Sequence, residues 1–408
     1  MYASTVRQMR ELDRRAVEEY GIPDDLLMEN AGQAVYCVML RQARVREGRF
    51  LVVSGPGNNG GDSFVVARKL HSAGAQVRVA AMAGPAVYTG PSARNLARLE
   101  KTGVELLDRP GPEQLAETLA WADIVVDGLL GTGLTRDLEG PLAQVVQLIN
   151  EAPTPVFSID IPSGVDSDNG RIRGAAIKAD TTVTFGLPKL GNVLGRGASL
   201  GGRLFVSPIS FPPALIENAG FRVALNEPAP IPRHQNISIS WVRSRARWGG
   251  KGGASETRPS LLIIQAVDLP RSTGRTQVQI DADPISPVQE LASERGTTIV
   301  VQGRRALIGL PDGRAFINPT GGSLRAVVAG RDEIIRQAVR SSSALGLSPE
   351  DALLTGVFVE GMAADFVAHA RATTTPTARD IAGYLAHAMR TLGEGDARAT
   401  PDGIPELI

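Results

Sequence analysis

The sequence predicts an α/β protein whose first half contains a mainly parallel sheet with helices on both faces. Between residues 50 and 207, short apolar segments alternate with segments of helical periodicity, which is the pattern of parallel strands joined by crossover helices. Glycine-rich turns follow three of the apolar segments, as expected where strands end at a ligand. The chain has 408 residues, which is more than one domain usually holds, so a second domain is expected.

The elements of the first half follow from this alternation. Residues 4–46 have apolar side chains at helical spacing and are expected to form two helices, broken at Gly21–Pro23, with Ser4 as the first N-cap. The strands expected next are 50–54, 75–82, 124–127, 156–160, 181–185 and 204–207. The helices expected between them are 62–70, 91–101 and 138–150.

The second half begins after a change in composition. We expect a first domain over 1–227, a basic linker rich in Gly, Ser and Pro over 228–259, a second domain over 260–392 and a flexible tail over 393–408. Arginines and two tryptophans in the linker would also suit an arm that contacts phosphate or RNA, although charged linkers are usually only solvated. In the second domain, strands are expected at 261–266, 297–301 and 306–310, and helices at 323–343, 348–370 and 377–392.

Composition excludes several classes of protein. Lysine plus arginine and aspartate plus glutamate both number 43, so the chain is not a nucleic-acid-binding polycation. Aromatic residues make up only 4%, which argues against a surface that stacks bases. A single cysteine, a start without an apolar signal segment and the lack of an 18-residue apolar run predict a cytoplasmic protein with no membrane partner.

The first glycine-rich loop follows the strand expected at 50–54. Gly55, Gly57 and Gly60 fit the spacing G-x-G-x-x-G, in which backbone N–H groups approach a pyrophosphate at the start of a helix. A nicotinamide dehydrogenase would also need an acidic residue about 20 positions later. After Asp62 the next carboxylate is Glu100, so that function is disfavoured. The alternative is a structural turn in which Asp62 stabilises the helix N-terminus.

Two further loops have the same position relative to a strand. One runs from Asp127 to Asp137 and the other from Asp160 to Gly164. Because parallel strands end at the same edge of a sheet, the loops are expected to gather Asn59, Asp127, Asp160 and Ser163 in one pocket. Such oxygen ligands suit a group 1 or group 2 cation, and these loops contain no histidine or cysteine that would favour zinc.

The first half resembles the NAD(P)H-hydrate epimerases, the YjeF N-terminal family. The resemblance covers about residues 4–217 and is carried by separate motifs that occur in order: Met9–Asp13 with Met28–Gly32, Gly57–Asp62, Asp127–Leu134, Asp160–Gly164, and Lys178–Asp180 with Thr184–Lys189. It implies a Rossmann-like three-layer αβα domain. It also implies an isomerase that interconverts the R and S epimers of hydrated NADH or NADPH, in which the nicotinamide carries a hydroxyl at C6.

The resemblance also implies site residues. The hydrate would be bound by Asn58, Asn59, Gly60, Gly61 and Asp62, by Gly131, Thr132, Gly133, Leu134, Thr135, Arg136 and Asp137, and by Asp160. Potassium would be bound by Asn59, Asp127 and Ser163. Our hypothesis is that Asp160 transfers the proton, because it follows a strand and faces the ligand loops; the alternative is that it only orients the site. The family usually has glycine at position 63, where this chain has Ser63, and we expect altered affinity without loss of function.

Residues 286–392 resemble the ADP- or ATP-dependent NAD(P)H-hydrate dehydratases, a ribokinase-like family. Pro311–Arg314, Asn318–Gly321, Asp332 and the segment 356–365 carry the resemblance. The family's Gly-Ser-Gly-Asp anion loop reads Ala329–Asp332 here, so Arg331 replaces the glycine before the aspartate. Gln302 stands where a lysine that contacts the nucleotide is expected, and about a hundred residues of the family's first part are missing. This resemblance implies a reduced, degenerate domain with a vestigial site at Gly330 and Asp332.

Three hypotheses remain at this stage. The first is an epimerase, expected to be a homo-oligomer, whose dehydratase domain is inactive and serves a structural role. The second is a bifunctional enzyme that also consumes ADP or ATP. The third is a non-catalytic nucleotide-binding or scaffold protein, which the joint presence of Asn59, Asp127, Asp160 and Ser163 disfavours.

Overall fold

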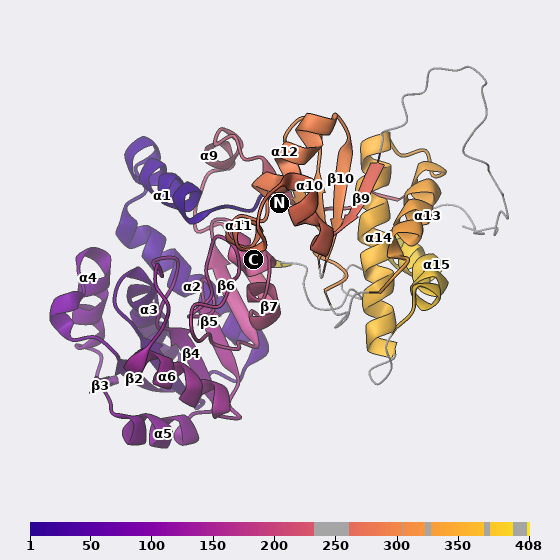
Figure 1. Cartoon of the computed structure of the whole chain (residues 1–408). Helices are drawn as coiled ribbons and strands as arrows, with labels where there is room; N and C mark the ends of the chain where they lie inside the picture. Colours follow the sequence, from indigo (N-terminus) through magenta and orange to yellow (C-terminus); the bar gives the residue numbers. More distant parts are fainter. Residues whose placement is uncertain (232–260, 304, 323–327, 371–375, 395–405) are drawn as a thin grey trace, which may run out of the picture. The chain divides into compact units, whose positions relative to one another are not determined.

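The computed structural model describes residues 1–231, 261–303, 305–322, 328–370, 376–394 and 406–408. The chain divides into two compact units. The first unit contains residues 2–221 and the final residues from 403, and the second contains Met1 and residues 222–402. Figure 1 shows the helices and strands of both units, coloured along the sequence.

The first unit is built on a parallel sheet. In the described part of the chain its strand order is β13-β7-β6-β5-β4-β1-β2-β3, and every neighbouring pair is parallel. The strands are β1 (Arg49–Ser54), β2 (Gln76–Ala81), β3 (Glu105–Asp108), β4 (Ile124–Gly128), β5 (Val156–Ile159), β6 (Thr181–Phe185), β7 (Arg203–Ser207) and β13 (Glu406–Leu407). The predicted α/β fold with a mainly parallel sheet is therefore confirmed.

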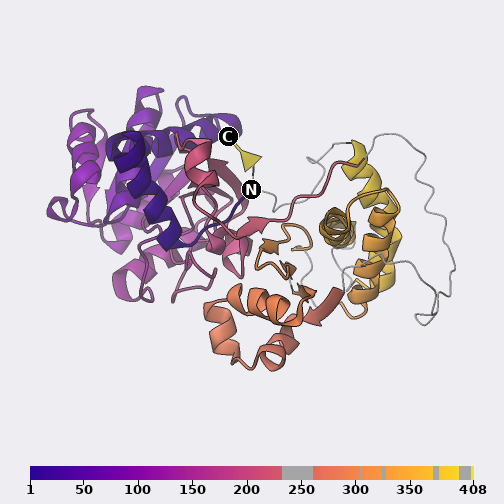
Figure 2. The same cartoon turned by 90° about the horizontal axis from the view of Figure 1, so that it is seen from above.

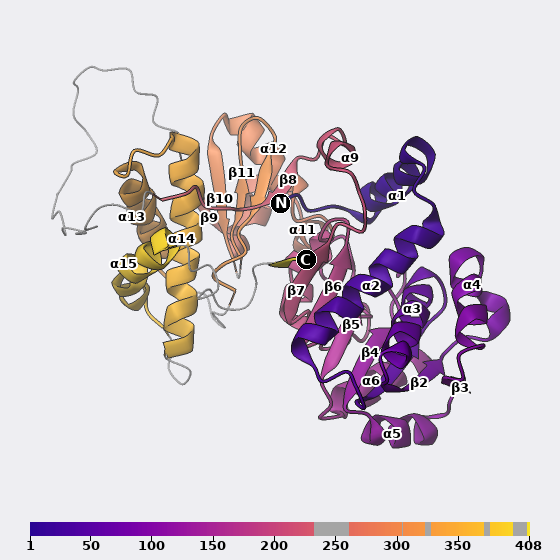
Figure 3. The ribbon, with the colours of Figure 1, turned by 180° about the vertical axis from the view of Figure 1, so that it is seen from behind.

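Helices cover both faces of this sheet, because its central strands are apolar on both faces. Phe50 and Val52 of β1 pack with α1 (Val6–Tyr20), α2 (Asp24–Gln42), α3 (Asn58–Ser72) and α4 (Gly90–Leu99). Leu51 and Val53 pack with α5 (Pro112–Trp121) and α6 (Gly140–Glu151) on the opposite face. Figure 3 looks onto the face that carries α2. Shorter elements complete the unit: η1 (Pro85–Val87), α7 (Leu190–Val193), α8 (Gly197–Leu200) and α9 (Pro213–Glu217).

The sheet has a topological switch point between β1 and β4, where successive strands of the chain begin to be added on the other side of β1. From β1 the chain moves outward through β2 and β3, then crosses back to form β4 on the other side of β1. At such a reversal, the connections that leave the two strands diverge and open a crevice at the carboxyl edge of the sheet. The glycine loop after β1 and the loop after β4 both begin at this point, so the topology places the candidate site here.

Two details of the first unit differ from the sequence predictions. The first helix is capped by Thr5, not Ser4: the Thr5 hydroxyl accepts from the backbone N–H of Gln8, and the Gln8 side chain accepts from the N–H of Thr5. This reciprocal pair satisfies two N–H groups at the helix start. The sequence reading also missed β3 and α5, since Glu105–Asp108 is a half-exposed edge strand without a continuous apolar run.

The second unit is a smaller α/β layer structure. Its described sheet has the order β8-β12-β11-β10-β9, with antiparallel pairs at β10–β11 and β11–β12 and parallel pairs at both ends. The strands are β8 (Val223–Leu225), β9 (Leu261–Gln265), β10 (Thr298–Gln302), β11 (Leu307–Gly309) and β12 (Ala315–Ile317). One face packs on α10 (Leu269–Thr273), α11 (Gln277–Ala282) and α12 (Ser286–Arg295), which follow η2 (Ala266–Asp268). The other packs on α13 (Arg331–Ser343) and α14 (Pro349–Ala370), beside α15 (Ala378–Glu394).

Three boundaries differ from those expected. The division between the units falls at Phe221, because β8 pairs with β12 of the second sheet. The helix expected from residue 323 begins at Arg331, after Gly330 in a left-handed conformation. The predicted flexible tail over 393–408 includes strand β13, seen at the chain end marked C in Figure 2. Most of the predicted linker, from residue 232 on, lies outside the described residues.

Helix α14 is the most apolar long helix in the described part of the chain. By length and composition it could cross a membrane, but 83% of its most apolar window is buried inside the structure. Burial on all sides is typical of the central helix of a folded core.

Candidate active site

The loops after β1 and β4 pack so tightly that only glycine fits at their contact. A Cβ at Gly55 would lie 1.7 Å from the carbonyl oxygen of Leu129, and one at Gly60 would lie 1.9 Å from that of Gly55. The Gly55 N–H donates to the carbonyl of Gly128, 3.1 Å away. The glycines thus bring the first turn of α3 directly against the loop that follows β4.

Asp160 begins the loop after β5 and has an unusual backbone. Its φ is +68°, a left-handed conformation that non-glycine residues seldom adopt. The surrounding structure holds it there: its N–H donates to Val183, and its carbonyl accepts from the side chain of Asn192. Backbone strain of this kind costs about 1–3 kcal/mol and is concentrated at functional sites.

The carboxylate of Asp160 forms a buried ion pair with Lys189. Nζ of Lys189 lies 2.5 Å from Oδ1 of Asp160, and the hydroxyl of Thr184 donates to the same oxygen at 2.9 Å. Lys189 is only 3% exposed, and its ammonium also reaches Thr184 Oγ1 and the carbonyl of Phe185. No described residue donates to Oδ2 of Asp160. One oxygen is therefore fixed by the protein, and the other is left for a ligand.

Two more carboxyl groups lie within electrostatic reach of this pair. Asp62, on the first turns of α3, is buried; burial, followed by the charges of Asp160 and Asp13, raises its pKa well above the ordinary value. Asp13 comes from α1, and its pKa is raised to about 6, mainly because surrounding protein displaces water from a side chain that still reaches solvent. Lys189 opposes both shifts. Clusters of perturbed titratable groups are typical of catalytic sites.

Asp127 and Ser163 are in direct contact, as the sequence predicted from their positions at the carboxyl end of β4 and after β5. The fully buried carboxylate of Asp127 accepts from the Ser163 hydroxyl at 2.5 Å and from its N–H at 2.9 Å. It also accepts from the Ser158 hydroxyl and the N–H of Leu129. Burial raises the pKa of Asp127, although these donors act against the shift.

Asn59 lies beside this pair. Its side chain borders Gly131, where an added Cβ would come within 3.3 Å of Asn59 Oδ1, and its buried Nδ2 has no hydrogen-bond partner among the described residues. The structure therefore places Asn59 and Ser163 against the loop that follows β4 and Asp127. Asp160 belongs to the neighbouring cluster around Lys189.

The remaining predicted ligand residues form the more open part of the site. Asn58 is exposed at the start of α3, whereas Gly60 and Gly61 are buried beneath it. In the second loop, Gly131, Thr132 and Leu134 are half-buried, and Gly133, Thr135, Arg136 and Asp137 are exposed. Arg136 forms no ion pair with a described residue. An exposed, uncommitted guanidinium next to a glycine loop can bind phosphate.

Ser63 does not point into open space as a free hydroxyl. Its Oγ donates to the carbonyl of Gly60 at 2.7 Å, and its Cβ packs against Gly128. The residue is completely buried.

In the second unit, a buried ion pair lies at the start of α13, next to the predicted vestigial site at Gly330 and Asp332. Arg331, at the start of α13, binds Glu360 of α14 through two bonds, Nε–Oε1 at 2.6 Å and Nη2–Oε2 at 2.9 Å. Both side chains are at least 90% buried. Burial is the largest single influence and acts to lower the pKa of Arg331, but the charge and hydrogen bonds of Glu360, together with the charge of Asp365, raise it overall. Asp332 is exposed on the first turn of the same helix, after Gly330.

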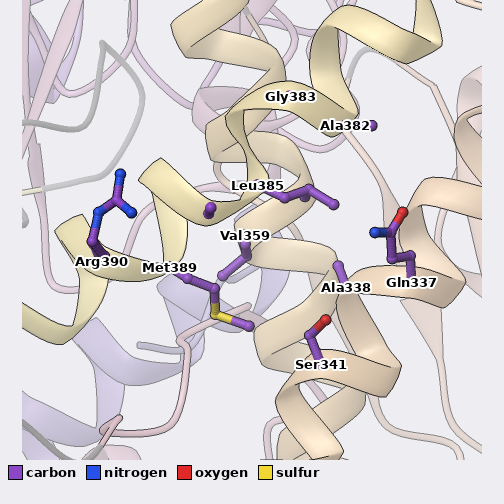
Figure 4. Close-up of a pocket in the computed structure, with 10 residues that line it drawn as sticks. Gln337, Ala338, Ser341, Val359, Ala382, Gly383, Leu385, Met389 and Arg390 are labelled. Atoms are coloured by element: carbon purple, nitrogen blue, oxygen red, sulfur yellow. The ribbon is translucent and has the colours of Figure 1, made fainter. Parts of the chain in front are cut away.

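A cavity of about 260 Å³ lies elsewhere in the second unit, between α13, α14 and α15 (Figure 4). Val359, Leu385 and Met389 supply much of its apolar lining, with Gln337 and Arg390 among its polar residues. No predicted site residue lines it, so the chemistry is not placed there.

Comparison with known proteins decides the family. A family model described as YjeF-related protein N-terminus matches residues 24–191. The bifunctional NAD(P)H-hydrate repair enzyme Nnr of Thermofilum pendens is 32% identical, and the match covers 97% of this chain and 97% of that protein. The chain belongs to the Nnr family of NAD(P)H-hydrate repair enzymes. The resemblance stated from the sequence motifs is thereby confirmed.

Within the Nnr family, the first unit corresponds to the epimerase part. The NAD(P)H-hydrate epimerase of Limosilactobacillus fermentum is 35% identical over 211 residues, which is 50% of this chain and 95% of that protein. A solved yeast protein is 23% identical with a TM-score of 0.46, covering 54% of this chain and 94% of its own. That structural likeness is low, and the family assignment follows from the sequence relatives.

The alignment with the Thermofilum pendens protein also shows that this chain is the shorter of the two. It extends over 511 positions, whereas this chain has 408 residues, so more than one hundred aligned positions have no residue of this chain opposite them. Because the epimerase of Limosilactobacillus fermentum is matched over 95% of its length by half of this chain, most of the missing positions fall outside the epimerase part.

Sequence reasoning missed three polar residues of this Nnr site. Lys189 and Thr184 bind Asp160, and Asp13 lies within its electrostatic reach. A signal was available, since all three lie in motifs that carry the family resemblance. Nothing in the spacing alone indicates that a lysine 29 positions after Asp160 returns to it, because that contact depends on how the chain closes after β6.

Proposed function

We propose that this chain is an NAD(P)H-hydrate epimerase that interconverts the R and S epimers of hydrated NADH or NADPH. The names of its relatives support the substrate class. The single observation that carries the proposal is Asp160, a strained residue at a strand end with one oxygen bound by Lys189 and the other without a donor among the described residues. A carboxylate held in this way can accept a proton from a ligand in the crevice.

The chemistry required is modest. In the hydrate, C6 carries a hydroxyl and is bonded to the ring nitrogen, whose lone pair can assist departure of the hydroxyl. A planar C6 results, and readdition of water on the other face gives the opposite epimer. In this proposal Asp160 takes the proton from the returning water. The closely packed glycine loops hold the reactive intermediate away from other nucleophiles.

Backbone N–H groups and Arg136 supply the phosphate contacts in this proposal. Helix α3 has 15 residues and begins at the crevice with Asn58, without a side-chain cap on its first N–H groups. Free N–H groups at a helix start, together with the helix dipole, favour a phosphate. Arg136, exposed in the facing loop, can pair with the same group.

We further propose that Asn59, Asp127 and Ser163 hold potassium. Their chemistry fits, because all three offer oxygen ligands, and the fully buried carboxylate of Asp127 has no cationic partner among the described residues. Among the described residues there is no group of three or more His, Cys, Asp and Glu side chains that would suit a transition metal. When bound, the cation would offset the buried charge of Asp127 and fix the loop after β4.

For the second unit, we propose that dehydratase activity has been lost and that its role is structural. Arg331 occupies the start of α13, where the family has glycine before its catalytic aspartate, and Glu360 neutralises it internally. The length shortfall in this part supports the same conclusion. The alternative is a bifunctional enzyme that consumes ADP or ATP, which the name of the full-length relative favours. A cytoplasmic location and a homo-oligomeric state are also part of the proposal.

One experiment separates these hypotheses. The purified chain is given a mixture of both hydrate epimers, with and without ADP or ATP, and each epimer is followed by chromatography. Interconversion without nucleotide-dependent loss of hydrate is the expected result. Nucleotide-dependent loss would establish the bifunctional alternative, and no change of either epimer would leave a binding or scaffold protein.

The role of Asp160 is tested by Asp160→Asn. We expect the epimerisation rate to fall by at least about 100-fold, since a general base usually contributes that much. Asp108→Asn is the matched control, because Asp108 is an exposed carboxylate at the carboxyl end of β3 that pairs with Arg109. A folded Asp160→Asn protein with the wild-type rate would remove Asp160 from the mechanism.

A further inference from the structure

Asp62 is a buried carboxyl group that receives no hydrogen bond from a described residue. The residue is 8% exposed, and burial and nearby charges, with no hydrogen bond among the causes, shift the pKa of its carboxyl group. Burying an ionised carboxylate without donors is costly, and the usual outcome is that the group keeps its proton. Because helical side chains lean toward the helix N-terminus, Asp62 is directed back toward the glycine loop.

The charges around Asp62 favour the same state. Asp160 after β5 and Asp13 on α1 are both carboxyl groups, and Lys189 before α7 is the cation within reach. The three N–H groups of Lys189 have acceptors in Asp160, Thr184 and Phe185. Lys189 therefore has no hydrogen bond left for Asp62. Burial and the two carboxyl groups outweigh its attraction, and the pKa of Asp62 is raised.

The result is a pair of carboxyl groups in different environments. Asp160 is held by an ammonium and a hydroxyl, as suits a carboxylate. Asp62 has neither, as suits a neutral acid. Two carboxyl groups whose surroundings separate their protonation states can divide the work of acid and base.

We propose that Asp62 is the general acid of the reaction, a neutral carboxyl group that protonates the hydroxyl as it leaves C6. This inference rests on the proposed epimerase function. The C6–O bond breaks with its electron pair on oxygen, the oxygen takes the proton of Asp62 and leaves as water, and the nitrogen lone pair forms a double bond to C6. Water then adds to the other face and gives its proton to Asp160. Exchange with solvent returns one proton from Asp160 to Asp62.

The first test measures protonation without using activity. The full chain is labelled with ¹³C at the aspartate carboxyl groups and titrated by NMR. At pH 7 we expect one carboxyl signal in the protonated range that is absent from the spectrum of Asp62→Asn. A spectrum in which every aspartate is ionised at pH 7 would overturn the proposal.

The second test measures kinetics in the same variant. Asparagine keeps the shape of the side chain but cannot donate the proton, so kcat should fall by at least about 100-fold while KM changes much less. Asp108→Asn again serves as the control. A folded Asp62→Asn protein with wild-type kcat would overturn the acid role. If the wild type itself does not interconvert the epimers, the proposed function fails, and the NMR titration still decides the state of Asp62.

Discussion

The ion pair between Arg331 and Glu360 gives a quantitative prediction for the second unit. In Glu360→Gln the guanidinium of Arg331 stays buried while its partner loses its charge. The two side chains are 8% and 2% exposed, so solvent cannot replace the lost carboxylate. Asp365 is also within electrostatic reach of Arg331 and compensates in part.

The magnitude follows from burial and geometry. Two unit charges about 4 Å apart interact by about 4 kcal/mol at an effective dielectric constant near 20, and removing one partner of a buried pair usually costs about 3–5 kcal/mol. We therefore expect Glu360→Gln to destabilise the second unit by about 3 kcal/mol. Replacing both residues, as Arg331→Met with Glu360→Leu, should restore most of that loss, because an apolar pair has no charge to desolvate.

Native-state hydrogen exchange read by mass spectrometry confines the measurement to the second unit. A loss of about 3 kcal/mol corresponds to a change of roughly 100-fold in an equilibrium constant, at about 1.4 kcal/mol per tenfold. Amides of α13 and α14 should therefore exchange roughly 100-fold faster in Glu360→Gln, and peptides from α3 serve as the unchanged control. A loss of less than about 1 kcal/mol in the free energy of unfolding of the second unit of Glu360→Gln would refute the reasoning. So would a double variant that is as unstable as the single one.

Two further predictions concern the first unit. In Gly60→Ala the new Cβ would lie 1.9 Å from the Gly55 carbonyl oxygen, so the loop must shift. We expect the free energy of unfolding, measured with a chemical denaturant, to fall by about 1–3 kcal/mol. Gly133→Ala is the control and should have no steric cost, because nothing lies within 4 Å of its added Cβ. Equal stability of the two variants would contradict the packing argument. Asp13→Asn tests the pKa of about 6, which is raised from 3.8 chiefly because surrounding protein displaces water from the carboxyl group. Because the folded state holds this proton more tightly than the unfolded state, the wild type loses stability as pH rises from about 4 to about 6, and the variant does not. The melting temperature of the variant relative to wild type should therefore rise across that interval and level off above it; a difference independent of pH would contradict the assignment.

The sequence predicted the parts of the fold that local patterns determine. The apolar segments after residue 50 correspond to β1, β2, β4, β5, β6 and β7, because buried parallel strands are apolar on both faces. The half-exposed β3 lacks that pattern and was missed. In the second half, β8 and β12 have three residues each and were missed. The equally short β11 was predicted, because it lies within the apolar run Ala306–Leu310.

Some residues of the candidate site could also be placed from the sequence, whereas the partners of others could not. Asp127 and Ser163 could be placed together because each follows a parallel strand, and they are in contact. The partner of Asp160 could not be placed, since Lys189 reaches it from the residue before a short helix that follows β6. Glu360 likewise lies in the middle of α14, and only the packing of α13 on that helix brings Arg331 to it.

Strand β13 has a consequence for how the two units can be separated. It pairs with β7 across about two hundred residues of chain, so the second unit is an insertion in the sequence of the first. Arg203 and Glu406 reinforce the pairing, and Ile408 donates to Val206 beside it. A fragment that stops at Phe221 would leave the N–H and C=O groups of β7 unpaired at the border of its sheet, where a strand from another molecule can add. Excising the second unit while rejoining its flanking segments would keep that border covered.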